Sequence, residues 1–260
     1  MPPANDPIEI TLAAHREYYA QGGYDDGRLK WTISEFLASQ NFGRALQVGC
    51  GDGAMLELMG TNCLEVVGVD ASSSGIQRCL SRGVQALCLD ISTDGLPFPD
   101  DSFDVIVSLE TFEHLMNPHF AFQEIRRTLR PGGKFLCSVP NPLTGHPYLY
   151  PGLFEYRRFR SFLEQSGFEI SRVAHWEWTP REVYLPPSLR RVPVLNGRTI
   201  TRGLRRLTEK GSRAVGAFPY FCYWLGTFDC RNNNANAPSD FEKVSEQTRP
   251  GSTNHFSPAS

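Results

Sequence analysis

Three glycines within residues 45–56, ALQVGCGDGAML, constrain the fold of this chain more than any other feature of its sequence. An apolar run precedes the glycines and a second apolar segment follows them. Glycine allows a turn between a strand and a helix to bring its backbone close to a ligand, and the N–H groups at the helix start favour polar ligand groups. The pattern therefore predicts a strand, a ligand-binding turn and a helix, in that order.

Apolar runs and helical periods alternate along most of the chain, which is typical of a parallel sheet with helices on its faces. The expected helices are 54–60, 72–83 with a serine cap, 117–133 stopped by its Pro-Gly-Gly, and one that begins near residue 155 and ends at Gly167. The expected strands are 44–49, 64–70, 84–90, 103–110, 134–140, one after Gly167, and 220–228.

The composition restricts the class of protein. A chain of 260 residues with 40% hydrophobic content can bury a full core, as one α/β domain with appendages. The net charge of −2 gives no general attraction to nucleic acid, and the seven cysteines show neither a CxxC pair nor zinc spacing. The N-terminal sequence lacks the pattern of a signal peptide, and no run of about 18 apolar residues occurs. We expect a cytoplasmic protein without a bound metal.

Three regions are expected along the chain. Residues 1–40 form an N-terminal helical lid, 41–230 form the main domain, and the polar tail 231–260 is disordered. A basic insertion, about 176–219, lies within the main domain. Residues 199–213 of it place arginines around an apolar helical face, which predicts either a solvated helix or contact with an anionic membrane or phosphate-bearing partner.

Acidic residues near the turn indicate the ligand. Asp70 ends the second strand, 17 residues after Gly53, and can accept from ribose hydroxyls in either an NAD or an S-adenosylmethionine site. Asp52 lies inside the turn, where a negative charge opposes a pyrophosphate but not a cationic sulfonium. Asp90 ends the third strand, in a position to accept from an adenine amino group.

With these features the chain resembles the class I S-adenosylmethionine-dependent methyltransferases, in particular the small-molecule branch called methyltransferase type 11. The resemblance covers roughly residues 42–142. Its motifs are LQVGCGDG, VVGVDASSSGI, CLDISTDGLPFPDDSFDVIVSLETFEHL and LRPGGKFLCSVPNP, in the family's order.

The resemblance implies a Rossmann-like sheet of seven strands in the order 3-2-1-4-5-7-6, with helices on both faces and 220–228 antiparallel. It also assigns cofactor contacts: the glycine turn, Asp70 on the ribose with Ala71 beside it, Asp90 and the Ile91 backbone on the adenine, and the end of the fourth strand facing the methionine portion. Gln47 departs from the family, which usually has an acid there. The implied cofactor residues are Gln47, Gly49, Cys50, Gly51, Gly53, Asp70, Ala71, Asp90, Ile91 and Leu109.

Two histidines are candidates on the acceptor side. His114 follows the fourth strand and could act as a general base, although a packing or capping role accounts for it equally well. His146 lies in a loop that resembles the family's acceptor-side segment. The sequence thus predicts methyl transfer from S-adenosylmethionine to a hydroxyl of a small molecule, lipid or glycan intermediate. The alternatives are an NAD-dependent oxidoreductase and a methyltransferase-like binding protein without catalysis.

Overall fold

A computed structural model describes residues 26–140, 149–150, 152–174 and 224–233 of the chain. The helices are α2 (Asp26–Thr32), the π-helix η1 (Ile33–Leu37), α3 (Ala54–Met59), α4 (Ser73–Ser81), the short 3-10 helix η2 (Phe112–His114), α5 (Pro118–Thr128) and α6 (Tyr156–Gln165). The strands are β1 (Phe42–Val48), β2 (Cys63–Asp70), β3 (Gln85–Cys88), β4 (Phe103–Leu109), β5 (Leu129–Pro140), β6 (Phe168–Ala174) and β7 (Trp224–Asn232).

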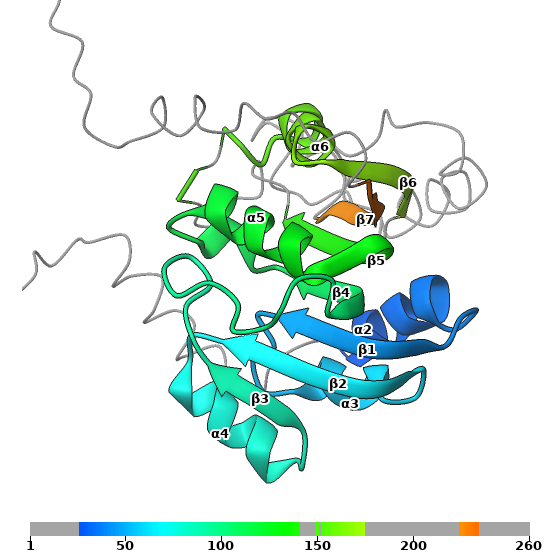
Figure 1. Ribbon diagram of the computed structural model, residues 1–260, viewed down its shortest axis with the longest axis vertical. Coiled ribbons are helices and arrows are strands. Elements are labelled where there is room, and N and C mark those ends of the chain that lie inside the picture. Colours follow the sequence, from blue (N-terminus) through cyan, green and yellow to red (C-terminus); the bar gives the residue numbers. More distant parts are fainter. Residues whose placement is uncertain (1–25, 141–148, 151, 175–223, 234–260) are drawn as a thin grey trace, which may run out of the picture.

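All seven strands form one sheet in the order β3-β2-β1-β4-β5-β7-β6, visible in Figure 1 as a ladder that ends at β3 and β6. The first five strands pair in parallel. In contrast, β7 is antiparallel to both β5 and β6. The predicted order is confirmed, together with the antiparallel strand between the fifth and the sixth.

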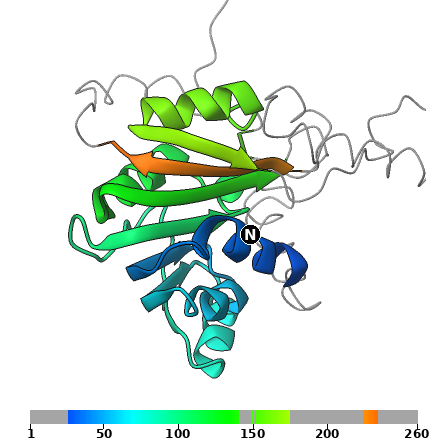
Figure 2. The same cartoon turned by 90° about the vertical axis from the view of Figure 1, so that its right-hand side faces the viewer.

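Helices cover both faces of the sheet, and the turned view in Figure 2 shows the two layers. On one face, residues of α2, η1 and α3 pack against β1, β4 and β5, and α4 joins them beside β2 and β3. On the other face, aromatic residues of α5 and α6 pack against β4, β5 and β7. A parallel strand covered on both sides is mostly apolar, which explains the largely apolar sequence of β4.

Several element boundaries differ from the expectations. The strand β3 is Gln85–Cys88 rather than 84–90, so Asp90 follows it and does not end it. The helix α5 ends at Thr128, before the Pro131-Gly132-Gly133 sequence that was expected to stop it, and this sequence lies in the first part of β5. The strand β7, described from Trp224, continues past the expected strand end at 228 and includes Arg231 and Asn232. The Asn232 carboxamide donates to the carbonyl of Leu129 at 2.5 Å, which joins β7 to the start of β5.

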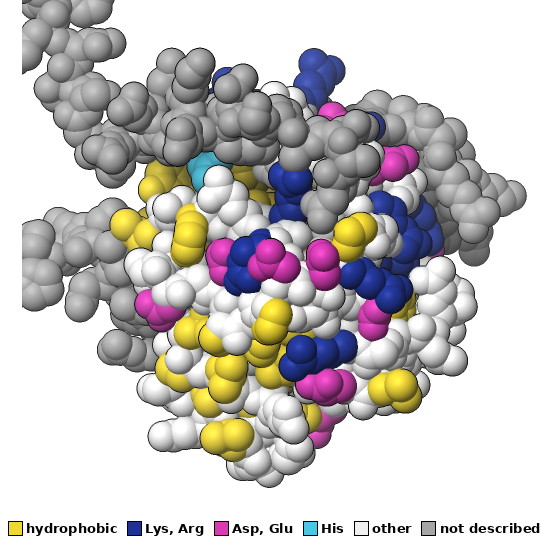
Figure 3. Space-filling view, viewed as in Figure 1, with side chains coloured by type: hydrophobic (Ala, Val, Ile, Leu, Met, Phe, Trp, Pro, Cys, Tyr) yellow, Lys and Arg dark blue, Asp and Glu magenta, His cyan; other side chains and the backbone are white. Residues whose placement is uncertain are grey.

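The surface drawn in Figure 3 has charged side chains of opposite sign side by side across its middle and hydrophobic ones below. Among the residues described, none of the helices combines the length and the apolar character needed to span a bilayer. Several predictions concern other parts of the chain: His146, the basic insertion with 199–213, the tail from 234, and most of the N-terminal lid lie outside the described residues.

Candidate functional site

The glycine turn joins β1 to α3 and requires glycine at each of its three positions. Gly49, Gly51 and Gly53 have φ values of 72°, 54° and 85°, a region that side chains rarely tolerate. Gly49 donates its N–H to the Val69 carbonyl at 2.8 Å, which holds the turn against β2. A Cβ at Gly49 would lie 2.0 Å from Thr111 Oγ1. The turn therefore sits at the carboxyl end of β1, as predicted.

Asp70, the last residue of β2, is bonded to this turn. Its carboxylate accepts the Gly51 N–H at 2.8 Å and the Ser72 N–H at 2.7 Å. Ser72 in turn caps α4 by accepting from the Gly75 N–H. Asp70 thus connects the glycine turn with the start of α4, and Ala71 lies exposed between them.

Asp90 lies at the same edge of the sheet, two residues after β3. The Asp90 carboxylate accepts the Ser92 N–H at 2.8 Å, and its own N–H donates to the Asp94 carboxylate at 2.9 Å. The Ile91 side chain is buried in the core, which fixes the direction of the chain after Asp90. Because β2 and β3 are parallel neighbours, Asp70 and Asp90 follow adjacent strand ends.

Asp52 does not have the role expected from its charge. Its carboxylate accepts the Ala54 N–H at 3.2 Å, at the start of α3, and forms an ion pair with Arg82 at 3.2 Å. The Arg82 guanidinium offsets the negative charge, so Asp52 no longer distinguishes a sulfonium from a pyrophosphate. Because Arg82 is 30 positions away in the sequence, no local pattern indicated that it would pair with Asp52.

Two buried side chains lie beside the turn. Gln47 is 2% exposed, and among the described residues its Oε1 atom has no hydrogen-bond partner. The Cys50 sulfur lies 3.9 Å from the Cys79 sulfur, and Cys79 donates to the Gly51 carbonyl. The hydrogen bond with Cys79 and burial raise the pKa of the Cys50 thiol, which keeps it neutral. Cys50 therefore supports the turn from inside the core.

The end of β4, expected to face the methionine portion from Ser108 to Glu110, carries a charged pair whose second partner the sequence did not single out. Glu110 follows Leu109 with an unusual φ of 55° and forms an ion pair with Arg28 of α2. Such a backbone conformation in a residue other than glycine occurs preferentially at functional sites. The Arg28 and Glu110 side chains are only 10% and 14% exposed. Nothing in the sequence near Arg28 marks this partnership.

His114 lies in η2, one residue after the buried Glu113. The His114 Nε2 atom is 3.7 Å from Glu113 Oε1, and the histidine side chain is 10% exposed. Loss of hydration raises the pKa of Glu113 to about 8, partly offset by Arg28. The structure therefore brings His114 to the strand end that carries Leu109 and Glu110, next to a carboxyl group that stays protonated at neutral pH.

Comparison with known proteins identifies the region that contains these features. A family model described as "Methyltransferase domain" matches residues 46–137. Residues 46–137 form a methyltransferase domain. The predicted resemblance to methyltransferases is confirmed over these residues.

Two curated relatives extend the match beyond this methyltransferase domain. A "Probable S-adenosylmethionine-dependent methyltransferase" of Mycolicibacterium smegmatis is 33% identical over 146 residues, which is 53% of this chain and 57% of that protein. "Phosphoethanolamine N-methyltransferase 1" of Zea mays is 31% identical over 169 residues, which is 60% of this chain and 30% of that protein. The chain thus spans less than two thirds of the length of each.

Solved structures share the fold of the methyltransferase domain. A putative sarcosine dimethylglycine methyltransferase from Galdieria sulphuraria superposes with a TM-score of 0.54 at 18% identity, over 79% of this chain and 85% of that one. The dinucleotide-binding sheet of NAD enzymes has the order 3-2-1-4-5-6. The antiparallel β7 between β5 and β6 therefore distinguishes this fold from that of the NAD enzymes. The charge of Asp52, which pairs with Arg82, does not make that distinction.

Proposed function

We propose that this chain transfers a methyl group from S-adenosylmethionine to a hydroxyl of a small molecule, lipid or glycan intermediate. The observation that carries the proposal is the glycine turn at the end of β1, hydrogen-bonded to Asp70 and set in a sheet with an antiparallel β7. The name of the Mycolicibacterium smegmatis relative supports the cofactor.

The residues around the turn suit this cofactor. A carboxylate offers about four acceptor positions, so an Asp70 that accepts the Gly51 and Ser72 N–H groups can also receive ribose hydroxyls. Asp90 and the Ile91 backbone would hold the adenine. The buried Gln47 Oε1 would accept a hydrogen bond from the cofactor's ammonium group. When bound, S-adenosylmethionine would supply a methyl group on a positively charged sulfur.

The end of β4 would face the cofactor, and His114, a few residues later, would face the acceptor. Leu109 and Glu110 would face the methionine portion, and Arg28 holds the Glu110 side chain in place. Alignment of the acceptor behind the methyl carbon supplies most of the rate of such a displacement. His114 would remove the proton of a hydroxyl acceptor. A nitrogen acceptor, as the name of the Zea mays relative states for that protein, also loses a proton overall. Its neutral amine form can attack without a base in the displacement itself, so His114 would matter less.

Calorimetry with S-adenosylhomocysteine, NAD and NADP in parallel tests the cofactor. We expect binding of S-adenosylhomocysteine only; tight binding of NAD would overturn the proposal. The acceptor atom is tested next, with isotope-labelled S-adenosylmethionine and panels of hydroxyl and amine compounds. With a hydroxyl acceptor, His114→Gln should lower turnover by about 100-fold and leave cofactor affinity unchanged. Unchanged turnover would point to alignment alone.

Contact of residues 199–213 with an anionic membrane remains a prediction from their sequence. Each basic residue near such a surface contributes about 1 kcal/mol, and the attraction is screened within roughly 10 Å at 0.1 M salt. Co-sedimentation with anionic vesicles should therefore be strong at low salt and weak at high salt. No co-sedimentation at low salt would instead favour 199–213 as part of an acceptor-side lid, with its apolar face inward and its arginines solvated.

A further inference from the structure

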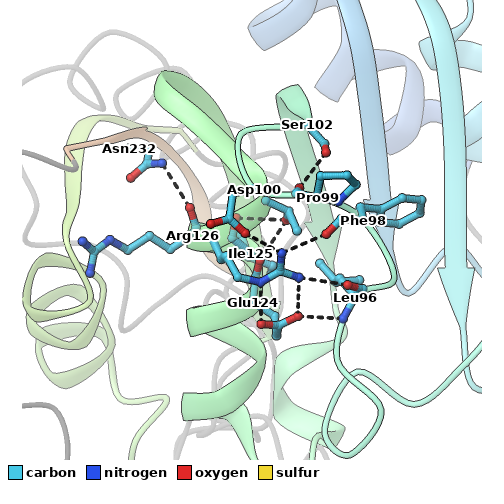
Figure 4. Close-up of polar contacts among 11 residues, drawn as sticks. Leu96, Phe98, Pro99, Asp100, Ser102, Glu124, Ile125, Arg126 and Asn232 are labelled. Atoms are coloured by element: carbon cyan, nitrogen blue, oxygen red, sulfur yellow. Dashed lines mark hydrogen bonds and ion pairs between the residues drawn. The ribbon is translucent and has the colours of Figure 1, made fainter.

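The ion pair of Glu124 and Arg127 on α5 binds residues within the segment 91–101, which connects Asp90 to β4. Figure 4 shows Glu124 with three of these residues, Leu96, Phe98 and Asp100. Arg127 donates to both carboxylate oxygens of Glu124, at 2.8 and 2.7 Å. The same guanidinium donates to the carbonyl oxygens of Leu96 and Phe98, at 2.9 and 2.8 Å, and to the Asp100 carboxylate at 2.8 Å. One side chain thus binds three positions of the segment.

Glu124 makes a further contact with the same segment. Its Oε2 atom accepts the Leu96 N–H at 2.8 Å, so the pair binds both the N–H and the carbonyl of Leu96. Gly95 has a φ of 70°, and a Cβ there would lie 3.0 Å from Glu124 Oε2. The close approach of this backbone to the carboxylate therefore depends on glycine. The hydrogen bond from Arg127 lowers the pKa of Glu124, which keeps the pair charged.

The contacts continue from Leu96 to Asp90. The Asp94 carboxylate accepts the Asp90 N–H at 2.9 Å, and the Asp94 N–H donates back to the Asp90 carbonyl at 2.8 Å. Only Gly95 separates Asp94 from Leu96. A displacement of Leu96 would therefore shift Gly95 and Asp94. Asp94 is hydrogen-bonded to Asp90, so the direction of the Asp90 carboxylate would change as well.

We propose that Glu124 and Arg127 are positioning residues for cofactor recognition, which set Asp90 and the Ile91 backbone against the adenine ring. This inference rests on the proposed function. Neither residue acts on the ligand directly, because their contacts described here are with the segment 91–101 and not with the glycine turn or Asp70. Their effect is on the choice of base, through the direction in which Asp90 accepts a hydrogen bond.

Changing the purine base of the ligand tests this inference. A purely structural role of Glu124 and Arg127 predicts no change in the preference for one base over another. Adenine presents a donor amino group and an acceptor ring nitrogen, whereas hypoxanthine presents an acceptor and a donor at the same two positions. S-Inosylhomocysteine should therefore bind the wild-type protein about tenfold or more weakly than S-adenosylhomocysteine, since a hydrogen bond to a charged group is lost. The quantity to measure is the ratio of the two dissociation constants.

In Arg127→Met, the preference for adenine should fall to within about threefold, because Asp90 is no longer held. Glu124→Gln should reduce the preference by a smaller factor, because the amide oxygen can still accept from the Leu96 N–H. The matched control is Arg160→Met, which breaks an exposed ion pair with Glu164 on α6 and should keep the wild-type ratio. Hydrogen exchange should accelerate at residues 91–98 of Arg127→Met and stay unchanged at the glycine turn.

The outcomes separate this inference from the proposed function. A wild-type protein that binds neither compound overturns the proposed function and the inference with it. A wild-type protein that prefers adenine, with an unchanged ratio in Arg127→Met, overturns the inference alone, even if both affinities fall together. If Arg127→Met fails to fold, Arg127→Lys keeps the charge without the two-pronged contact, and its ratio decides in the same way.

Discussion

At Gly49 the methyltransferase domain depends on the absence of a side chain. A Cβ there would meet Thr111 Oγ1 at 2.0 Å, in addition to the strain of a φ of 72°. Gly132 has a φ of 71° but nothing within 4 Å of its added Cβ. Backbone strain of this kind costs about 1–3 kcal/mol. We expect Gly132→Ala to lose about that much stability, and Gly49→Ala to lose more and to bind no cofactor.

Urea unfolding of the two glycine variants measures this difference, and calorimetry with S-adenosylhomocysteine measures the binding. Equal losses of stability in both variants would show that Thr111 moves aside at little cost. The prediction for Gly49 would then be wrong.

Glu113 makes the stability of the domain depend on pH. Its pKa rises from 4.5 to about 8 on burial, while the unfolded chain keeps the lower value. Below pH 4.5 both states hold the proton. Between pH 4.5 and about 8 only the unfolded state releases it, so the free energy of unfolding falls by at most about 1.4 kcal/mol per pH unit. Above that range the penalty is constant.

Glu113→Gln should remove this contribution, because an amide has no proton to release. Chemical unfolding at a series of pH values should show the variant losing less stability than the wild type between pH 5 and 8. The control is the exposed Glu164→Gln, which should follow the wild type. Parallel curves for Glu113→Gln and the wild type would contradict the raised pKa.

Local signals at the level of elements made much of the fold predictable. The serine before α4 does cap it, and the turn glycines do end β1. The ends of α5 and β7 were not predictable, because contacts between distant segments set them. Asn232 joins the end of β7 to the last turn of α5 and the first residue of β5, about 100 residues earlier. A polar residue followed by a polar tail gives no such signal.

The same limit applies to the candidate site. Asp70, Asp90 and the glycines occupy strand ends and turns, where a motif specifies the residue types. Arg28 and Glu110 meet only because α2 packs near the end of β4. Charge partners that are far apart in sequence leave no periodic or local pattern, so the predictions included neither Arg28 nor Glu113.

Asn232 allows a prediction about the last strand. Its buried carboxamide donates to the carbonyls of Arg126, Leu129 and Arg130 (Figure 4 shows Arg126 and Asn232). Asn232→Ala leaves these carbonyls without that donor, which should cost about 1–3 kcal/mol of unfolding free energy. Asn233→Ala, one residue later, should cost less. Urea unfolding compares them, and an Asn232→Ala protein as stable as the wild type would rule out this anchoring.

Across the whole molecule, the site lies where the two packed faces meet the same sheet edge. One face of the sheet carries α4, which Asp70 connects to the glycine turn. On the other face, α5 binds the segment that follows Asp90. Ligand contacts at this edge would therefore depend on the packing of both layers. A ligand that binds only the folded protein should stabilise the entire domain.

Ligand-linked stability distinguishes the carboxylate that would hold the ribose from one that only supports the fold. At a concentration 100 times the dissociation constant, S-adenosylhomocysteine should raise the unfolding free energy of the wild type by about 2.7 kcal/mol. Asp70→Ala should weaken binding by about ten- to a hundredfold, so the same concentration should add only about 0.4–1.4 kcal/mol. Both values come from chemical unfolding with and without the ligand.

Asp52→Ala is the matched control for Asp70→Ala. The Asp52 carboxylate accepts the Ala54 N–H and pairs with Arg82, so its loss should also destabilise the ligand-free protein. The gain on adding S-adenosylhomocysteine should nevertheless stay near the wild-type value, since Asp52 is not expected to contact the ribose. An equal gain in Asp70→Ala and Asp52→Ala would mean that Asp70, like Asp52, only connects the turn to its neighbouring helix, and the ribose would have to be held by other groups.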